Sequence, residues 1–390
     1  MRITHVITRL IVGGAQENTI ASVRGLGRIP GFTVGLIAGP SPGPEGSLES
    51  TLADSPGTLT VLPHLVRPVH PWHDWMALRA LAKLFRRNRP DLVHTHSGKA
   101  GILGRLAAAR ARVPIVVHTI HGPSFGAFQA ALPNWLFRRA ERRASKVTSH
   151  FVSVADAMTA QYLAAGIGSP AQYTTIFSGF DLSPFAAAPN DPATRARWNL
   201  APNDFVVGKI ARLFKLKGHD DLLAVAPELA RRCPRLKFLL VGDGAWRVRF
   251  QNRARELGLE RQIIFTGLVP PAEIPALVGI MDALVHLSRR EGLPRALPQA
   301  LAAGKPVVAF DCDGAKEVCL EGRTGFLLAP GDRVGLVARL LQLADDRALC
   351  RRLGEFGRDW VKERFAVETM IDRLHELYLR LARASAIRVT

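Results

Sequence analysis

Short apolar runs alternate with longer amphipathic stretches along most of the 390-residue chain. Apolar runs bounded by Gly, Pro or polar residues are typical of strands that are buried on both faces of a sheet. Eleven runs of this kind predict strands at residues 3–7, 34–38, 92–96, 115–120, 151–155, 205–211, 237–242, 263–267, 283–287, 307–310 and 325–329. The stretches between them have helical periodicity, so we expect an α/β fold with parallel sheets covered by helices on both faces.

A proline-rich segment divides this pattern into two halves. Residues 183–204 contain four prolines and no strand pattern, which indicates a linker. We expect two doubly wound, Rossmann-like domains facing a cleft, over residues 1–185 and 186–365. The remaining residues, 366–390, should contain an amphipathic helix from about Val367 to Ala384. In such sheets, ligands bind at the carboxyl ends of the strands.

The chain is strongly basic, with 52 Lys and Arg residues against 33 Asp and Glu residues and a net charge of +19. The excess lies in both halves, unlike a basic tail. It favours an anionic partner, which could be a nucleotide-linked substrate, an anionic lipid or a nucleic acid. Aromatic residues make up only 7%, and the sequence has no nucleic-acid-binding module, so nucleic acid is not an expected partner.

The cysteine content and the apolar runs bear on the compartment. Four cysteines without a C-x-x-C pair fit a reducing environment and argue against a disulfide framework or a structural zinc site. The first residues lead directly into a strand-like run without a signal-peptide pattern, and no apolar stretch has the length of a spanning helix. We expect a cytoplasmic protein, which is compatible with peripheral binding at the inner face of the plasma membrane.

The segment 288–309 carries the most specific candidate chemistry. An apolar run leads into a charged loop that contains Glu291. Gly292 and Pro294 are expected to start a helix of about two turns, which ends at Gly304. Backbone amides at a helix N-terminus bind anions, so a carboxylate beside such a pocket suits a ligand that joins phosphate to a sugar.

Two cations follow the first strand of the second domain. Arg212 and Lys217 flank the loop at the end of this strand, where they suit a diphosphate; the alternative is a solvated charge pair beside a helix cap. Gly242 follows the next strand, and Leu268 and Val269 follow the one after it. Either loop could be a plain turn, and the second is well placed for main-chain contacts to a nucleobase.

In the first domain, Gly13 and Gly14 follow the first strand, and Gln16 lies at the start of the helix after them. Glycines at this position let a ligand approach the backbone closely, or they form a tight turn. The spacing is not that of a dinucleotide-binding G-x-G-x-x-G loop. His121, which is followed by Gly122 at the end of a strand, is the candidate for contact with substrate.

Two patterns could indicate a metal site. Four histidines lie on two neighbouring strand ends, with no cysteine or acidic residue at ligand spacing: His94, His96, His118 and His121. Asp311 and Asp313 form a D-x-D pair, a string that holds a divalent metal in one class of sugar-nucleotide enzymes, but Gly314 follows as in an ordinary turn. We expect histidines that hydrogen-bond the backbone, a plain turn, and no metal.

A basic stripe is expected along one helix of the first domain. Its members fall at i, i+3, i+4, i+7, i+8 and i+11, and they are Trp135, Arg138, Arg139, Arg142, Arg143 and Lys146. A basic amphipathic helix with an aromatic residue suits an anionic lipid surface, and the alternative is an ordinary solvated face.

Taken together and in order, these motifs resemble those of glycosyltransferase family 4, a group of retaining, nucleotide-sugar-dependent transferases with the GT-B fold. The resemblance covers almost the whole chain. The segments that carry it are residues 13–16, 94–105, 116–122, 176–181, 211–218, 239–244, 265–269 and 288–309. The combination is highly specific for the family, although no single segment is. It implies that the final helix crosses back onto the first domain.

The family has a motif of two glutamates separated by seven residues. Here Glu291 occupies the first position and Gln299 the second. The resemblance implies that the first acid contacts the donor sugar or its phosphate surroundings, and that the second position holds the ribose hydroxyls. The amide of Gln299 can still hydrogen-bond ribose, but without the charge-assisted bond that a carboxylate makes.

The resemblance implies transfer with retention and no protein nucleophile. The expected donor is a nucleotide-sugar, with UDP as the nucleotide, and the expected acceptor is a saccharide or a lipid-linked molecule in polysaccharide, lipopolysaccharide or glycolipid synthesis. The residues expected to act in catalysis are Glu291, His121, Arg212 and Lys217. Further donor contacts are expected from Gly13, Gly14, Gly242, Leu268, Val269, Gly292, Leu293 and Gln299, and acceptor contacts from Gly14, Gln16 and His121.

Two other functions are weighed against this one. An isomerase similar to UDP-N-acetylglucosamine 2-epimerase would share the architecture and the ligand class, but those enzymes rely on several acids, whereas here Glu291 has a glutamine partner. A non-catalytic module that binds an anionic surface would be favoured by the loss of Arg212, Lys217 or Glu291, and all three are present.

Overall fold

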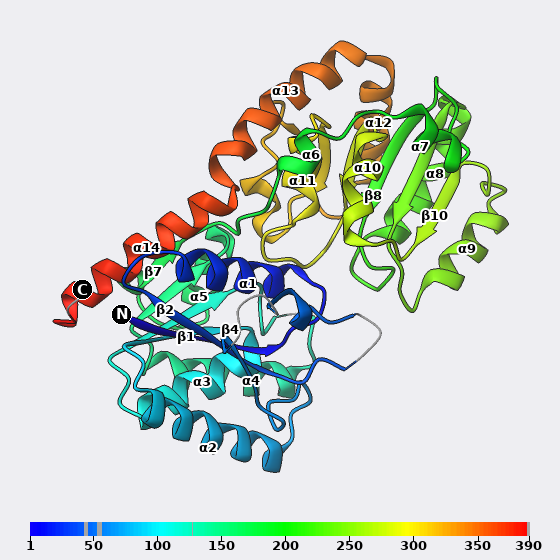
Figure 1. Cartoon of the computed structure of the whole chain (residues 1–390). Helices are drawn as coiled ribbons and strands as arrows, with labels where there is room; N and C mark the ends of the chain where they lie inside the picture. Colours follow the sequence, from blue (N-terminus) through cyan, green and yellow to red (C-terminus); the bar gives the residue numbers. More distant parts are fainter. Residues whose placement is uncertain (43–45, 53–56, 127, 388–390) are drawn as a thin grey trace. The chain divides into compact units, whose positions relative to one another are not determined.

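The computed structural model describes residues 1–42, 46–52, 57–126 and 128–387, and the chain divides into two compact units (Figure 1). The first unit comprises Met1–Gly179 and Val367–Thr390, and the second comprises Phe180–Ala366. Each unit is built around one parallel sheet. Within the described ranges, no helix combines the length and the apolarity that crossing a bilayer requires.

The sheet of the first unit has seven strands in the order β3-β2-β1-β4-β5-β6-β7. Their bounds are β1 Arg2–Arg9, β2 Thr33–Gly39, β3 Leu59–Val61, β4 Leu92–His96, β5 Ile115–Ile120, β6 His150–Ser153 and β7 Tyr173–Thr175. The strand order reverses between β1 and β4, and His5 of β1 pairs in register with His94 of β4. Loops that follow β1, β4 and β5 therefore emerge side by side at the carboxyl edge, where such sheets bind ligands.

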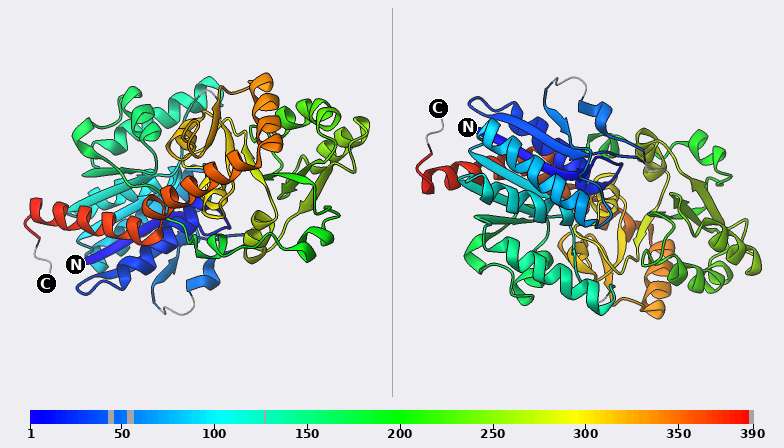
Figure 2. Two further views of the ribbon diagram at one scale, coloured as in Figure 1. Left: turned by 90° about the horizontal axis from the view of Figure 1, so that it is seen from above. Right: turned by 90° about the horizontal axis from the view of Figure 1, so that it is seen from below.

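Helices cover both faces of this sheet (Figure 1 and Figure 2). On one face, Leu26 of α1 and Leu377 of α14 join the strand residues in one apolar core. On the other face, Leu81 of α2 and Ala107 of α3 do the same. The helices are α1 Gly14–Gly27, α2 Pro71–Asn88, α3 Gly98–Arg110, α4 Ala131–Ser145, α5 Asp156–Ala164 and α14 Val367–Ala384, with 3₁₀ turns at Glu49–Leu52 and Pro170–Gln172.

The sheet of the second unit has six strands in the order β10-β9-β8-β11-β12-β13. Their bounds are β8 Phe205–Ile210, β9 Leu236–Val241, β10 Ile263–Gly267, β11 Ala283–His286, β12 Val307–Phe310 and β13 Gly325–Leu328. The order reverses between β8 and β11, which lie side by side. The loops after these two central strands share the carboxyl edge of the sheet.

The second unit packs its helices around an apolar core that includes Phe205, Phe238 and Leu340. Its helices are α6 Ser183–Ala186, α7 Pro192–Arg197, α8 His219–Arg232, α9 Arg247–Glu256, α10 Ile274–Gly279, α11 Ala296–Ala302, α12 Arg333–Asp345 and α13 Arg347–Arg364, with 3₁₀ turns at Pro271–Glu273 and Asp313–Glu317. The predicted α/β class, with two doubly wound Rossmann-like domains, is confirmed.

All eleven predicted strands are present, and the C-terminal helix has its predicted bounds. The prediction missed β3 and β7, which have only three residues each and contain no fully buried position. Residues 183–204 are not a plain linker, because α6 and α7 lie within them. The predicted helix start at Gly292 and Pro294 is wrong: α11 begins at Ala296, since the Gly292 carbonyl instead accepts a hydrogen bond from the Gly314 N–H at 3.0 Å.

Candidate functional site

Two loops at the carboxyl edge of the second sheet bring Lys217 and Glu291 together. Lys217 lies between β8 and α8, and Glu291 follows β11. The Lys217 Nζ lies 2.5 Å from Glu291 Oε1, and His286 Nε2, at the end of β11, lies 3.5 Å from the same oxygen. The side chains of Lys217 and Glu291 retain 21% and 19% exposure, so the ion pair is largely shielded from water but still accessible.

The Glu291 carboxylate is held in its charged form. Burial favours the neutral acid, but the nearby His286 ring and the charge of Lys217 outweigh it and keep the pKa of Glu291 well below its ordinary value. Burial also lowers the pKa of His286, so that imidazole is neutral at neutral pH. A charged carboxylate therefore lies beside Lys217 at the carboxyl edge of this sheet.

The backbone around Lys217 explains why a glycine follows it. Leu216 and Gly218 both have positive φ angles, of 70° and 71°. A Cβ on Gly218 would lie 2.0 Å from the Leu287 carbonyl oxygen, so only glycine lets the β8 loop approach the β11 loop this closely. The Arg289 N–H donates to the Leu216 carbonyl at 2.8 Å and completes the junction.

The other predicted donor-binding residues of this unit lie at or near the same edge. Arg212 is exposed, with its guanidinium carbon 5.3 Å from the centre of the Phe214 ring. Gly242 follows β9 with φ 132°, and a Cβ there would lie 2.4 Å from the Ala211 carbonyl oxygen. Leu268 and Val269 follow β10, where Leu268 is 76% exposed. Gly292 and Leu293 follow Glu291 in the β11 loop, and Gln299 is buried within α11.

Asp313 acts on the Glu291 loop, a role that the sequence did not reveal. Asp313 begins the 3₁₀ turn after β12, as expected of a turn residue. Its Oδ2 accepts a hydrogen bond from the backbone N–H of Glu291 at 2.6 Å. Because β12 is the neighbour of β11, this bond fixes the loop that carries Glu291 to the adjacent loop.

In the first unit, the predicted glycine loop leads into α1. A Cβ on Gly13 would lie 2.8 Å from Gln16 Oε1, whereas a Cβ on Gly14 would meet nothing within 4 Å. Gly14 is exposed at the first position of this 14-residue helix. The helix N-terminus is therefore open to an anionic ligand.

Three imidazoles form a hydrogen-bonded row that runs from the carboxyl edge of the first sheet into its interior. His121 Nε2 lies 2.9 Å from His96 Nδ1, and His96 Nε2 lies 2.9 Å from His5 Nδ1. Burial lowers the pKa of His5 to about 3 and that of His121 to about 4. The row is therefore neutral at neutral pH, and it connects the partly exposed His121 with the buried His5.

The predicted histidines hydrogen-bond side chains, and His118 also has a backbone hydrogen bond at Thr95. His94 lies beside the row and bonds to Tyr378 Oη and, at 2.6 Å, to Thr119 Oγ1. Ring nitrogens of His5, His94 and His96 lie within 4.8 Å of one another, a spacing that could hold a metal ion. Five of these six nitrogens are engaged in hydrogen bonds, and only His5 Nε2 lacks a partner in the described part of the chain. Hydrogen bonding therefore accounts for the cluster.

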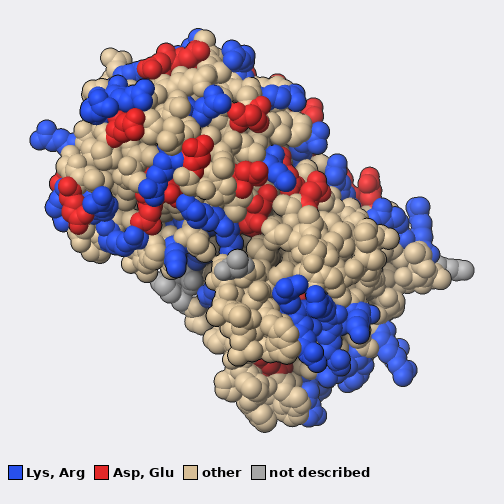
Figure 3. Space-filling view, turned by 180° about the vertical axis from the view of Figure 1, so that it is seen from behind, with Lys and Arg blue, Asp and Glu red and all other residues tan. Residues whose placement is uncertain are grey.

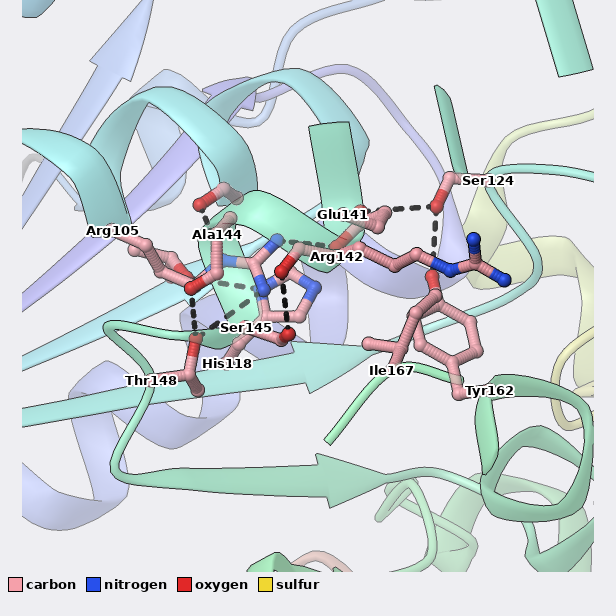
Figure 4. Close-up of polar contacts among 12 residues, drawn as sticks. Arg105, His118, Ser124, Glu141, Arg142, Ala144, Ser145, Thr148, Tyr162 and Ile167 are labelled. Atoms are coloured by element: carbon pink, nitrogen blue, oxygen red, sulfur yellow. Dashed lines mark hydrogen bonds and ion pairs between the residues drawn. The ribbon is translucent and has the colours of Figure 1, made fainter. Parts of the chain in front are cut away.

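A buried ion pair ties α3 to α4 and reaches the loop that carries His121 (Figure 4). The Arg105 Nη2 lies 2.5 Å from Glu141 Oε2, and neither side chain is exposed. Ser124, three residues after His121, donates to Glu141 Oε1 at 3.2 Å and lies 2.7 Å from Tyr162 Oη. His118, the remaining member of the four predicted histidines, is separate from the row and bonds to Thr95 Oγ1 at 2.9 Å.

The six residues of the predicted basic stripe line one groove on α4, together with Ala131 and Asn134. The Arg139 guanidinium carbon lies 5.6 Å from the centre of the Trp135 ring. Trp135, Leu132 and Leu136 are 55%, 66% and 51% exposed. A gathering of Lys and Arg side chains with few acidic ones among them is visible in Figure 3. This helix thus presents cations and large apolar side chains to solvent together.

Comparisons with known proteins give matches to both units. A family model described as Glycosyltransferase Family 4 matches residues 12–184, and one described as Glycosyl transferases group 1 matches residues 190–360. The Escherichia coli UDP-Gal:alpha-D-GlcNAc-diphosphoundecaprenol alpha-1,3-galactosyltransferase is 27% identical over 97% of this chain and 97% of its own length.

Two further similarities bear on the family and on the fold, respectively. The GDP-mannose-dependent alpha-(1-6)-phosphatidylinositol monomannoside mannosyltransferase of Mycolicibacterium smegmatis is 31% identical over 71% of this chain and 72% of its own. The crystal structure of Anabaena HepE in complex with UDP has the same fold, with a TM-score of 0.81 at 23% identity over 97% of this chain and 100% of that one. These matches do not favour the isomerase alternative. The chain belongs to the group 1, family 4-like glycosyltransferases, enzymes of the GT-B fold.

Proposed function

We propose that this glycosyltransferase moves a sugar from a UDP-sugar, with retention at the anomeric carbon, to a saccharide or lipid-linked acceptor. The observation that carries the proposal is the Lys217–Glu291 ion pair at the carboxyl edge of the second sheet. Arg212 lies just after the end of β8, in the loop that also contains Lys217. The name of the Escherichia coli relative includes UDP-Gal, and Anabaena HepE binds UDP. Both support a uridine nucleotide.

The reaction breaks the bond between the anomeric carbon and the diphosphate oxygen. Negative charge develops on that oxygen, where the guanidinium of Arg212 and the ammonium of Lys217 stabilise it. The same oxygen takes the proton of the acceptor hydroxyl, while the acceptor oxygen bonds to the anomeric carbon on the same face. The products are a glycoside and a nucleoside diphosphate. Glu291 holds the Lys217 ammonium in place and contacts the donor sugar.

The remaining candidate residues bind and orient the two substrates. Gln299 hydrogen-bonds the ribose, and the backbone of Leu268 and Val269 contacts the base. Main-chain groups near Gly242, Gly292 and Leu293 complete the donor site. In the first unit, Gly13 and Gly14 approach the donor phosphate and the acceptor, Gln16 contacts the acceptor, and His121 orients the donor sugar.

The proposed reaction uses no metal. A divalent cation in a transferase of this kind would neutralise the diphosphate. Here, Arg212 and Lys217 already supply two positive charges near the end of β8, and Asp313 is engaged with the backbone of Glu291. The histidine cluster of the first unit is likewise engaged in hydrogen bonds.

The groove on α4 suits a peripheral membrane enzyme. Cations attract anionic headgroups, and exposed Trp and Leu side chains enter the interface between headgroups and acyl chains. Trp135, Leu132 and Leu136 supply the apolar contacts, and the arginines of the same helix supply the charge. The enzyme would thereby meet a lipid-linked acceptor at the inner face of the plasma membrane.

A screen of UDP-, GDP- and ADP-sugars tests the donor assignment. The full chain is heated with each compound, and slow hydrolysis is measured without an acceptor. A UDP-sugar at about one hundred times its Kd should raise the unfolding midpoint by about 5–10 °C. The donor assignment fails if no nucleotide-sugar stabilises the protein and none is hydrolysed.

A further inference from the structure

A buried lysine lies in the strand that leads to the candidate donor site. Lys209 is the penultimate residue of β8, and only 1% of it is exposed. Its Nζ has no hydrogen-bond partner among the residues that the structure describes. An ammonium normally donates three hydrogen bonds, so this burial strongly disfavours the charged form.

The titratable groups that interact electrostatically with Lys209 come from two segments of the second unit. Lys217 lies in the loop before α8, and His219 and Asp221 lie in the first turn of that helix. His286 is the last residue of β11, and Glu291 lies in the loop after it. Burial lowers the pKa of both histidines, so neither is charged at neutral pH. The charges that act on the Lys209 amine are thus one cation, Lys217, and two anions, Asp221 and Glu291.

Both anions already have other cationic partners. Glu291 is paired with Lys217 at 2.5 Å. Asp221 is paired with Arg289 at 2.9 Å and with Arg333 at 3.3 Å. Within the described part of the chain, Lys209 therefore has no counter-ion of its own. Burial, together with the repulsion from Lys217, lowers the pKa of Lys209 to about 7.

We propose that Lys209 is a further residue of the donor-phosphate site, whose buried amine, without a hydrogen-bond partner of its own among the described residues, takes up a proton when the diphosphate of a nucleotide-sugar binds beside Lys217. This inference rests on the proposed donor site. The diphosphate brings negative charge into a poorly solvated region, and that charge stabilises a nearby ammonium. Lys209 then carries more positive charge when the donor is present, in addition to the charges of Arg212 and Lys217.

The proposal predicts how donor affinity changes with pH. A ligand that raises the pKa of a group binds more tightly when that group is protonated, so donor affinity falls as pH rises above the pKa of unliganded Lys209. A rise of about one pKa unit makes the affinity fall about five-fold between about pH 7 and about pH 9. At about pH 7.5, the same rise corresponds to uptake of about half a proton per donor bound.

Calorimetric titration measures this proton directly. UDP-galactose, UDP-glucose and GDP-mannose are titrated into the full chain in buffers of different ionisation enthalpy. These donors are suitable because, unlike a terminal phosphate, their diphosphate has no group that titrates near neutral pH. The slope of binding enthalpy against buffer ionisation enthalpy gives the protons taken up, a quantity that a purely structural lysine would not change.

Matched variants assign the proton to one side chain. Lys209→Met nearly keeps the volume of the side chain, Lys209→Gln replaces it by a shorter polar one, and both remove the titrating amine. Lys305→Met is the control, because burial also lowers the pKa of Lys305, which is partly buried, but its Nζ donates to the Gly279 carbonyl at 2.8 Å. We expect uptake in the wild type and in Lys305→Met, and no uptake with a flat affinity profile in either Lys209 variant.

The outcomes separate this inference from the donor assignment. Binding of a nucleotide-sugar to the wild type without proton uptake overturns the role of Lys209 and leaves the donor site intact. Uptake that persists in a folded Lys209 variant also overturns it. If no nucleotide-sugar binds to the wild type, both the donor assignment and the role of Lys209 are wrong. If both Lys209 variants fail to fold, the wild-type titration still tests the proposal, because binding without proton uptake overturns it.

Discussion

The carboxylate of Asp313 accepts the backbone N–H of Glu291 at 2.6 Å, and so joins the loop after β12 to the loop after β11. A hydrogen bond to a charged group contributes about 1.5–3 kcal/mol. We expect Asp313→Ala to lower kcat/KM by about ten-fold or more, because the Glu291 carboxylate is then less well positioned. Steady-state assays with a UDP-sugar measure this loss.

The conservative variant Asp313→Asn serves as the control, because its amide oxygen still accepts the Glu291 N–H. Its activity should stay within a few-fold of the wild type, with or without a chelator. An inactive Asp313→Asn enzyme would contradict this positioning role, and activity that a chelator abolishes and a divalent cation restores would show that the reaction needs a metal.

The histidine row makes the stability of the first unit dependent on pH. The pKa values of His5 and His121 are lowered in the folded protein, whereas an unfolded histidine takes up a proton near pH 6.5. Stability is therefore full above about pH 6.5 and is lost as pH falls toward the folded values. At about pH 5, each such histidine lowers the free energy of unfolding by about 2 kcal/mol.

Thermal unfolding at neutral and mildly acidic pH measures this loss. His5→Leu removes the buried end of the row, so the drop in the unfolding midpoint on acidification should be smaller in that variant than in the wild type. Equal drops in the two proteins would mean that the row does not resist protonation.

Removing one partner of the Arg105–Glu141 pair should destabilise the protein far more than replacing both partners by apolar residues. Removing one partner of a buried ion pair leaves an uncompensated charge and costs about 3–5 kcal/mol. Glu141→Leu and Arg105→Met should therefore each destabilise the first unit strongly, and the double variant should recover a large part of the loss. A double variant as unstable as the sum of the two single variants would contradict this interpretation.

The α4 groove predicts binding to anionic vesicles. Each cation near an anionic surface contributes about 1 kcal/mol, so Arg139→Gln with Arg143→Gln should weaken the partitioning about 30-fold. The effect should shrink at high salt. Flotation with phosphatidylserine vesicles measures it, and Arg351→Gln with Arg352→Gln, an exposed pair on α13, gives the same loss of charge as a control. Equal flotation of both double variants would refute a membrane role for α4.

The sequence predicted the fold well because apolar strands and amphipathic helices are local patterns. The two missed strands, β3 and β7, lack such a pattern, and they are positioned by their neighbours in the sheet. The start of α11 was misplaced because Gly292 bonds to the Gly314 backbone, which is a contact between two loops. Such contacts leave no trace in the local spacing of residues.

The candidate site was predictable only where the chemistry lies in consecutive residues. Lys217 and Glu291 were found through their loops, whereas the roles of His5 and Asp313 depend on which strands are neighbours. Lys209 did leave a signal, because a lysine inside the apolar run of β8 is unusual in a buried strand. That signal becomes informative once its burial and its lack of a hydrogen-bond partner among the described residues are known.

The ion pair between Lys217 and Glu291 is the centre of the proposed donor site, and donor binding to a lysine variant tests it most directly. Lys217→Met removes the ammonium and keeps the length of the side chain. Lys215→Met, which changes an exposed lysine in the same loop, is the matched control. With UDP-galactose or UDP-glucose, we expect Lys217→Met to bind about 100-fold more weakly than the wild type and to release no nucleoside diphosphate, since it loses a charge-assisted contact to phosphate. Lys215→Met should behave as the wild type, and a folded Lys217→Met enzyme with wild-type binding and turnover would contradict the account.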